Sequence, residues 1–350
     1  MLINVIWMQQ HGYITTFWDY VNSFKRYSRN EVIYTNITNI NLNADIIVLH
    51  NSIMHILVNN QKLKELYIKH LVKYEGKKVA IIQDEYYDVN LIKSFLEKIN
   101  IDLVLTCIPD KNKRDVYNNI PNARIERVLT GYVPEKMSLI QPIKNREIFI
   151  FYRGKNLPYY YGKLGQWKQN IGKKMFKYCE TNKIDNINIA WREQDKIFGK
   201  NWLKTMQNSK VTLATPSGLN VFHYDNSKIY ACLKKERTMP NYTYEMAEKE
   251  FNLQDGPIKM GQISPKMFEA AMCGTVLVMY PGTYNGIFKK DVHYIELQPD
   301  FSNIEEVMKK IKNDEFLQEM SDRTYKDIVE SNKYSYETFI SKVDRWLDEI

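Results

Sequence analysis

The sequence predicts an α/β fold of two Rossmann-like, doubly wound domains in succession, each built on a parallel sheet. Short apolar, β-branched runs alternate with amphipathic helical segments, a pattern typical of parallel strands with helices on both faces. At 350 residues, the chain exceeds the usual size of one core, so two domains of about 150 residues are expected. A polar segment around Pro142 separates two such series. We therefore expect domains at 1–140 and 141–330, with 331–350 as a final helix that packs back on the first domain.

The composition indicates a soluble globular protein that binds an anionic ligand. Hydrophobic residues make up 44% of the chain and charged residues 26%, which is ordinary for such proteins. Lysine and arginine number 49 against 41 aspartates and glutamates, for a net charge of +8. These cations are spread along the chain, so they do not indicate a nucleic-acid partner.

The cysteines and the apolar runs indicate the cellular compartment in which the protein is expected. The four cysteines are far apart in the sequence, which excludes a CxxC site and indicates a reducing environment. We recognise no signal peptide, and no apolar run approaches the roughly 20 residues of a membrane span. We expect a cytoplasmic protein, with peripheral contact at the inner face of the membrane as an alternative.

The first domain is predicted to begin with a strand at 2–8 and to continue through alternating helices and strands. Further strands are expected at 45–49, 78–82, 102–106 and 124–129, and helices around 17–24, at 63–73 and at 91–98.

Polar residues that follow these strands are the candidate catalytic residues. His11 lies in the loop after the first strand, His50 directly follows the second, and Asp84 and Glu85 follow the third. Because parallel sheets bind ligands at the carboxyl ends of their strands, His11, Asp84 and Glu85 are candidates for a general base. His50 is a candidate for a hydroxyl or acid–base contact. A structural role for His50 and helix capping by the carboxylates are the alternatives.

The second domain is predicted to repeat the alternation. Strands are expected at 147–152, 187–191, 211–214, 275–280 and 294–297, and helices at 162–178, within 224–261, from 265, before 312 and at 334–350.

Two cations mark the end of the first strand of the second domain. Arg153 and Lys155 flank a glycine there, where arginine can grip a pyrophosphate by its planar fork and lysine can act as a point charge. A solvated charge pair is the alternative. The position after a strand end favours the ligand-binding interpretation.

Two loops of small polar residues are further candidates for ligand contacts. The strand at 211–214 opens into a loop that carries Ser217, Gly218 and Asn220. A later glycine-containing loop carries Asn285 and Gly286.

The stretch at 263–282 carries the clearest local signals. Ser264 is predicted as an N-cap and Pro265 as the first helical residue, and Gly274 as the turn into a buried strand. Lys266 and Glu269 lie three residues apart on one face of this helix, at the mouth of the predicted sheet. A surface ion pair is the alternative.

These motifs resemble a known family. The run SPKMFEA at 264–270 with Gly274, the Arg153/Lys155 pair and the loop at 215–217 are similar to the second domain of GT-B glycosyltransferases of the "group 1" type and of CgeB-like bacterial proteins. Three further segments resemble a subgroup of bacterial glycosyltransferases, namely QDEY at 83–86, LTGYVPE at 129–135 and HYIELQPDFSN at 293–303.

The resemblance implies a GT-B fold, in which the two domains face each other across a cleft and the second binds a nucleoside-diphosphate sugar. It implies that Glu269 holds the ribose, that Arg153 and Lys155 hold the diphosphate, and that neither a metal nor another cofactor is required. The expected nucleotide-sugar contacts are Arg153, Lys155, Ser217, Gly218, Asn220, Gln262, Ser264, Lys266, Glu269, Asn285 and Gly286.

One position departs from the family pattern. Many members carry a second glutamate eight residues before the first, which contacts the donor sugar, whereas this chain has Gly261. We therefore expect the sugar contacts to come from Gln262, Asn220 and the loop at 282–286.

The sequence thus predicts a bacterial glycosyltransferase of polysaccharide biosynthesis, which moves a sugar from a nucleotide donor to a cell-surface glycan or glycolipid. The acceptor would be a saccharide or a lipid-linked saccharide. A sugar-nucleotide epimerase of the same fold and a non-catalytic nucleotide-sugar binder are the alternatives. The net charge of +8 also leaves a phage-type DNA glucosyltransferase as an alternative; it would predict steeply salt-dependent binding to duplex DNA, and no clustered basic helix supports it. The nucleotide base, the sugar, the stereochemical course and the oligomeric state stay open.

Overall fold

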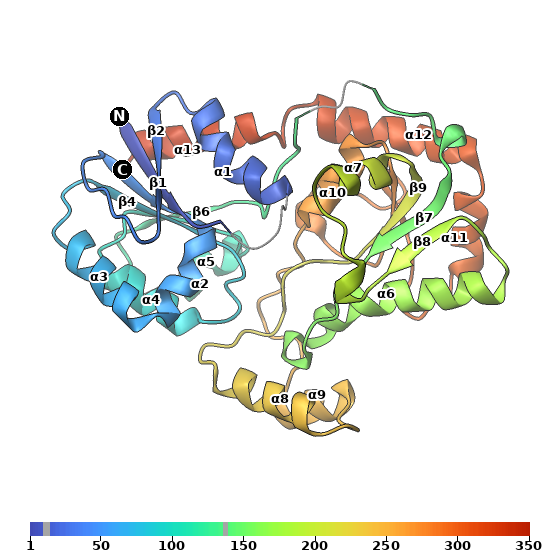
Figure 1. Cartoon of the computed structure of the whole chain (residues 1–350), viewed down its shortest axis with the longest axis horizontal. Coiled ribbons are helices and arrows are strands. Elements are labelled where there is room, and N and C mark those ends of the chain that lie inside the picture. The colour runs from blue at the N-terminus through green and yellow to red at the C-terminus, as the bar shows by residue number, and fades with distance from the viewer. Residues whose placement is uncertain (10–14, 136–138) are drawn as a thin grey trace.

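The computed structural model describes residues 1–9, 15–135 and 139–350, which form two α/β domains side by side (Figure 1). The first domain contains a parallel six-stranded sheet in the order β2-β1-β3-β4-β5-β6. Its strands are β1 (Leu2–Trp7), β2 (Glu31–Asn36), β3 (Ile46–Leu49), β4 (Lys77–Ile82), β5 (Leu103–Thr106) and β6 (Arg124–Arg127). Its helices are α1 (Thr15–Tyr27), α2 (Asn51–Asn59), α3 (Gln61–Leu71), α4 (Val89–Lys98) and α5 (Asp110–Val116).

The second domain contains a parallel five-stranded sheet in the order β11-β10-β9-β7-β8. Its strands are β7 (Ile148–Arg153), β8 (Ile187–Ala190), β9 (Ser209–Ala214), β10 (Val276–Met279) and β11 (Tyr294–Glu296). The helices packed with it are α6 (Gly162–Thr181), α7 (Gly199–Gln207), α10 (Pro265–Met272), α11 (Ile304–Ile311) and α12 (Asp314–Thr324). Two further helices, α8 (Ser227–Thr238) and α9 (Tyr244–Phe251), project from it (yellow in Figure 1).

The last helix, α13 (Tyr336–Asp348), lies on the first domain beside α1 (red and blue in Figure 1). Phe339 stacks on Tyr132 with ring centroids 4.4 Å apart. Asp344 accepts hydrogen bonds from the Ser28 hydroxyl (2.8 Å) and the Arg29 amide (2.9 Å). The chain therefore enters the second domain after β6 and returns to complete the core of the first.

Some elements were not predicted from the sequence. The edge strand β2 has a single neighbour, β1, and only Val32 of its six residues is buried, so it lacks the continuous apolar run of a doubly covered strand. The helices α2, α5, α7 and α12 were also not predicted, although Asn313 caps the start of α12 through its side chain. The buried runs of β3, β4, β5 and β10 gave the clearest patterns and lie where they were expected.

Hydrogen bonds join the domains across their facing edges. The Gln262 amide donates to the Cys107 carbonyl (2.8 Å), and the Thr130 hydroxyl donates to the Ile263 carbonyl (2.8 Å). The His223 amide donates to the Tyr86 carbonyl (2.8 Å). These hydrogen bonds fix the two domains so that the carboxyl ends of the strands of both sheets face one cleft.

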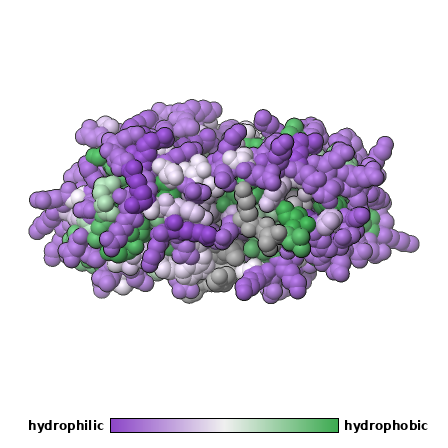
Figure 2. Space-filling model, turned by 90° about the horizontal axis from the view of Figure 1, so that it is seen from above, coloured by the Kyte–Doolittle hydropathy of each residue, from purple (hydrophilic) through white to green (hydrophobic). Residues whose placement is uncertain are grey.

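The surface is mostly polar. Figure 2 shows that hydrophilic residues cover most of the face seen from above and that its hydrophobic patches are small and separate. In the part of the chain that the structure describes, no helix is both long and apolar enough to cross a membrane.

Candidate functional site

A cationic pocket lies between β7 and β9, where the strand order of the second sheet reverses. Such reversal points are where open α/β sheets bind ligands. The pocket holds about 180 Å³, and its described lining contains cations but neither aspartate nor glutamate. The lining residues of this cationic pocket are Tyr152, Arg153, Gly154, Lys155, Lys168, Ala214, Thr215, Ser217, Ser264 and Lys266. This composition suits an anion such as a diphosphate.

Lys266 and Lys168 are crowded together in the cationic pocket. The Lys266 ammonium donates to the Leu213 carbonyl (2.8 Å) and lies 4.4 Å from the centre of the Tyr152 ring. Burial and the positive charge of Lys168 lower the pKa of Lys266 to about 7. Burial also lowers the pKa of Lys168, as does Lys155, while the charge of Asp84 raises it. An anion placed between these ammonium groups would relieve their repulsion.

Lys168 was not predicted as a site residue. The sequence shows it as one of several lysines on a basic helix, and the spacing alone does not identify the one that turns toward β7. In the structure Lys168 lines the cationic pocket, with its ammonium 3.5 Å from the Ser217 hydroxyl. One sequence pattern could have identified Lys168. It is a lysine in the first helix that follows a strand with Arg-Gly-Lys at its end.

Arg153 lines the cationic pocket, but most of its guanidinium N–H groups donate hydrogen bonds to other parts of the protein. Its Nε donates to the Asp195 carbonyl (2.8 Å), and its Nη atoms donate to the Asn188 carbonyl (3.0 Å) and side chain (2.6 Å). One Nη also donates to the Tyr152 carbonyl (2.9 Å). These bonds hold Arg153 against β8 and the turn that follows it, and its contact with a diphosphate stays a prediction. Lys155 is exposed at the rim of the cationic pocket.

The start of α10 supplies Ser264 and, one turn deeper, Glu269. Ser264 occupies the predicted N-cap position, but its side chain makes no capping hydrogen bond and lines the cationic pocket. Glu269 is buried and accepts a 2.8 Å hydrogen bond from the Trp202 indole. Glu269 is not part of the described lining of the cationic pocket, so its contact with a ribose stays a prediction.

The residues of the 217–220 loop divide into two groups. Ser217 lines the cationic pocket, whereas Asn220 bonds to the Asp255 side chain (3.0 Å) and the Met260 amide (3.0 Å). Gly218 has a φ of +77°, and a Cβ there would lie 2.8 Å from the Cβ of Met260. Gly218 and Asn220 therefore shape this loop.

Three other predicted contact residues are not in the lining of the cationic pocket. Gln262 joins the domains through the Cys107 carbonyl, as described above. The Asn285 side chain accepts from the Ile263 amide (2.7 Å), and Asn285 and Gly286 line a different pocket, next to α13. The cationic pocket thus brings together Arg153, Lys155, Ser217, Ser264 and Lys266. Gln262 lies beside it, because the backbones of Gln262 and Ser217 exchange two 2.8 Å hydrogen bonds.

The backbone conformation explains why position 261 is a glycine. Its φ is +47°, in the left-handed region, and a Cβ there would lie 2.7 Å from the Thr283 hydroxyl oxygen. Glycine adopts this conformation without strain. A glutamate at this position would be strained, so the contact expected from the family pattern cannot come from here.

A second pocket lies at the corresponding reversal point of the first sheet, between β1 and β3. It holds about 280 Å³. Its lining residues are Thr16, Phe17, Tyr20, His50, Asn51, Ser52, His55, Ile56, Gln83, Asp84, Tyr87, Thr130 and Pro265. Pro265 lines this first-domain pocket, and its neighbours Ser264 and Lys266 line the cationic pocket. The two pockets are therefore adjacent parts of one cleft.

Asp84 and Glu85 point in opposite directions. Asp84 is exposed, lines the first-domain pocket and accepts a 2.5 Å hydrogen bond from the Tyr86 hydroxyl. Glu85 is buried and accepts from the Cys107 amide (2.9 Å), the Tyr117 hydroxyl (2.6 Å) and the Thr106 hydroxyl. Burial raises the pKa of Glu85 to about 7. Glu85 is thus a structural residue, and we do not retain it as a catalytic base.

The Glu85→Ala variant is expected to be less stable by about 2–4 kcal/mol, because it leaves buried donors without their acceptor. Urea denaturation measures this loss. The adjacent Asp84→Asn variant is the control and should stay within about 0.5 kcal/mol of the wild type. Equal stability of Glu85→Ala and the wild type would contradict the assigned role.

The structure corrects the acid–base role expected of His50. His50 is fully buried and caps α2, where its Nδ1 accepts from the Ser52 amide (3.2 Å). Burial lowers its pKa to about 3, so the ring is neutral near pH 7 and cannot act as a general acid there. It keeps a place in the first-domain pocket. His11, the other predicted histidine, lies outside the described residues.

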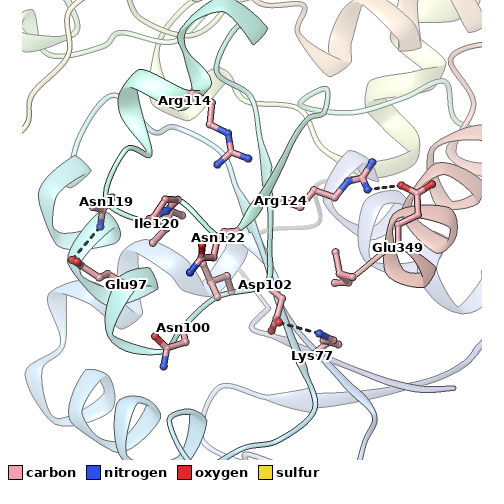
Figure 3. A pocket seen from close by; sticks show the side chains of 14 residues that line it. Lys77, Glu97, Asn100, Asp102, Arg114, Asn119, Ile120, Asn122, Arg124 and Glu349 are labelled. Carbon is pink, nitrogen blue, oxygen red and sulfur yellow. Dashed lines mark hydrogen bonds and ion pairs between the residues drawn. The ribbon is translucent and has the colours of Figure 1, made fainter.

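A third pocket lies at the opposite edge of the first sheet and does not resemble a site (Figure 3). Among its charged residues, Lys77 and Arg124 begin strands, Asp102 directly precedes a strand, and Glu349 directly follows α13. Lys77 lies 3.4 Å from Asp102, and Arg124 is paired with Glu349. Because parallel sheets bind ligands at the carboxyl ends of their strands, these pairs are best explained as structural contacts.

No protein-family model matches the sequence, and no curated protein matches it. Among solved structures, Anabaena HepE in complex with UDP-glucose has 9% identity, a TM-score of 0.53 and full coverage of both chains. T4 phage β-glucosyltransferase has 11% identity and a TM-score of 0.52, covering 100% of this chain and 99% of the phage chain. TarM is longer: the match covers 86% of this chain and 54% of TarM, at 12% identity and a TM-score of 0.47. The chain therefore has the fold of two facing Rossmann-like domains that the resemblance to GT-B glycosyltransferases predicted.

Proposed function

We propose that the protein is a glycosyltransferase that uses a nucleoside-diphosphate sugar. The diphosphate would bind in the cationic pocket and the acceptor in the first-domain pocket. The observation that carries this proposal is the pairing of these pockets in one cleft, with lysines on one wall and Asp84 on the other. HepE and the T4 enzyme, which share the fold, were solved with UDP-glucose or named as glucosyltransferases, and this supports the donor class.

In the proposed reaction, an acceptor hydroxyl attacks the anomeric carbon while Asp84 takes its proton. The bond from that carbon to the phosphate oxygen breaks, and the electron pair leaves with the diphosphate. Lys155, Lys168 and Lys266 stabilise the negative charge that develops there. The ammonium groups thus supply the positive charge in this proposal, without a metal. Attack from the side opposite the diphosphate would invert the anomeric configuration.

A bacterial cell-surface glycan or glycolipid is the proposed origin of the acceptor, and the cytoplasm the proposed location. If the acceptor is lipid-linked, the exposed lysines of α6, including Lys163, Lys173 and Lys177, could contact anionic lipid at the inner face of the membrane. The oligomeric state is open.

A thermal-shift panel of UDP, GDP, dTDP and CMP with their sugars tests the proposal. One diphosphate and its sugars should stabilise the protein, by about 2.7 kcal/mol at 100 times its Kd. Turnover of that sugar nucleotide then separates the alternatives. Attachment of the sugar to an acceptor, together with release of the nucleotide, supports transfer. Conversion of UDP-GlcNAc and water to ManNAc and UDP would instead indicate an epimerase. The absence of any shift would contradict the donor class.

A further inference from the structure

Buried polar atoms without partners gather at the first-domain pocket. The Tyr20 hydroxyl, His50 Nε2 and Asn51 Oδ1 are three of the seven buried side-chain atoms that lack a hydrogen-bond partner among the described residues. All three residues line this pocket, and Tyr20 and His50 are 3% and 0% exposed. Buried polar groups in native proteins are rarely unpaired. Such a concentration is therefore expected of a site whose ligand supplies the partners.

The hydrogen-bonding roles of these atoms can be assigned. His50 Nδ1 accepts from the Ser52 amide, so the proton of the neutral ring is on Nε2, which is a donor. Asn51 Oδ1 is an acceptor, and the Tyr20 hydroxyl can do both. Together they offer donors and acceptors at one place. Hydroxyl groups, which also donate and accept, are the matching ligand chemistry.

The charge of the first-domain pocket excludes an anionic ligand. Its described lining contains neither lysine nor arginine, and it contains the carboxylate of Asp84. Its other titratable groups are Tyr20, His50, His55 and Tyr87. The Nδ1 of His55 lies 2.9 Å from Asp88 and its Nε2 lies 3.1 Å from the Gln83 carbonyl, so both ring nitrogens already have acceptors, and Asp88 balances the charge of the protonated ring. A phosphate or carboxylate would meet Asp84 without a compensating cation.

The walls of the pocket are aromatic. Phe17 and Tyr20 line one side, with their rings each 5.6 Å from the His50 ring. Tyr87 stacks on His55 at 4.2 Å. Flat apolar faces beside hydrogen-bonding groups suit a ring with both apolar and polar edges. The volume of about 280 Å³ is at the lower limit for small-molecule sites.

We propose that the first-domain pocket binds the acceptor as an uncharged, hydroxyl-bearing sugar ring, whose hydroxyls pair with Tyr20, His50 and Asn51. The reacting hydroxyl then lies beside Asp84. This inference rests on the proposed function for the identity of the reaction, but it makes a separate claim about the ligand. Acceptors that carry a phosphate or carboxylate on this ring are excluded.

The test is titration of the wild-type protein with uncharged methyl glycosides, followed by saturation-transfer NMR, with and without saturating UDP. Methyl glucoside and methyl galactoside are paired with the matched anions glucose 6-phosphate and glucuronate. At least one methyl glycoside should bind, and the anions should bind at least tenfold more weakly. Glycoside binding should persist in the presence of saturating UDP. The titration is then repeated with UDP-glucose. If UDP-glucose displaces the methyl glycoside and UDP does not, the sugar ring in this pocket belongs to the donor, and the inference is overturned.

Tyr20→Phe removes only the unpaired hydroxyl and should weaken glycoside binding by about 3- to 10-fold, with no change in the Kd of UDP. Tyr280→Phe is the matched control, because the Tyr280 hydroxyl is also buried and unpaired but lies outside this pocket. It should change neither affinity. Equal binding of charged and uncharged sugars, or of wild type and Tyr20→Phe, overturns the inference. A protein that binds methyl glycosides but no nucleotide would instead contradict the proposed function.

Discussion

Asp84→Asn is expected to lower kcat by about 10²–10⁴-fold, the usual contribution of a general base, while the Kd of the nucleoside diphosphate stays unchanged. The amide cannot take a proton, but it matches the carboxylate in size. Asp84 has a φ of +59°, and asparagine tolerates this left-handed conformation better than most residues. The backbone of the loop should therefore be preserved.

Release of nucleoside diphosphate from the sugar nucleotide measures this effect, with water in place of the acceptor if the acceptor is unknown. The Glu85→Gln variant is a neighbouring control, since Glu85 points into the core. The Glu85→Gln substitution should lower the free energy of unfolding and leave the kcat of the folded protein unchanged. If Asp84→Asn kept most of the wild-type kcat, the base would have to be another group.

Lys266→Met is expected to raise the Kd of the sugar nucleotide by about 10- to 100-fold, as the loss of a charge-assisted hydrogen bond predicts. Methionine keeps most of the apolar stem that packs near Tyr152. Isothermal titration measures the change. Lys163→Met is the matched control on α6, because Lys163 is exposed and lies outside the cationic pocket. Equal losses in both variants would indicate a general effect of net charge.

The affinity for UDP-glucose should also depend on pH through Lys266. Burial and Lys168 lower the pKa of Lys266 to about 7, and its ammonium form is the one that binds the diphosphate. Below pH 7 that form is already present, so the Kd is constant. Above pH 7 binding must take up a proton, so the Kd rises, by at most about tenfold per pH unit. The Lys266→Met protein should lose most of this dependence, and an unchanged rise of the Kd above pH 7 in that variant would contradict the assignment.

Much of the fold followed from local patterns. The buried runs of β3, β4 and β10 and the Ser-Pro start of α10 are set by the sequence around them. The rule that ligands bind at the carboxyl ends of parallel strands then identified Lys155, Ser217 and Lys266 as neighbours. The structure places all three around one pocket.

The rest of the site depends on contacts between distant residues. Arg153 donates to acceptors on Asn188 and Asp195, which lie 35 and 42 residues away in the chain, so the local sequence could not show how its guanidinium is held. Asp84 and Glu85 are adjacent, and only the fold decides which carboxylate faces the cleft. The unpaired atoms of Tyr20 and Asn51 likewise become visible only when the fold brings α1 next to the start of α2.

The most direct test of the account is to titrate UDP-glucose into the wild-type, Asp84→Asn and Lys266→Met proteins and to measure turnover in parallel. The account predicts that Asp84→Asn binds like the wild type but does not turn over, and that Lys266→Met binds at least about tenfold more weakly. It would be contradicted if Asp84→Asn lost binding while Lys266→Met kept it, because the diphosphate would then not lie in the cationic pocket.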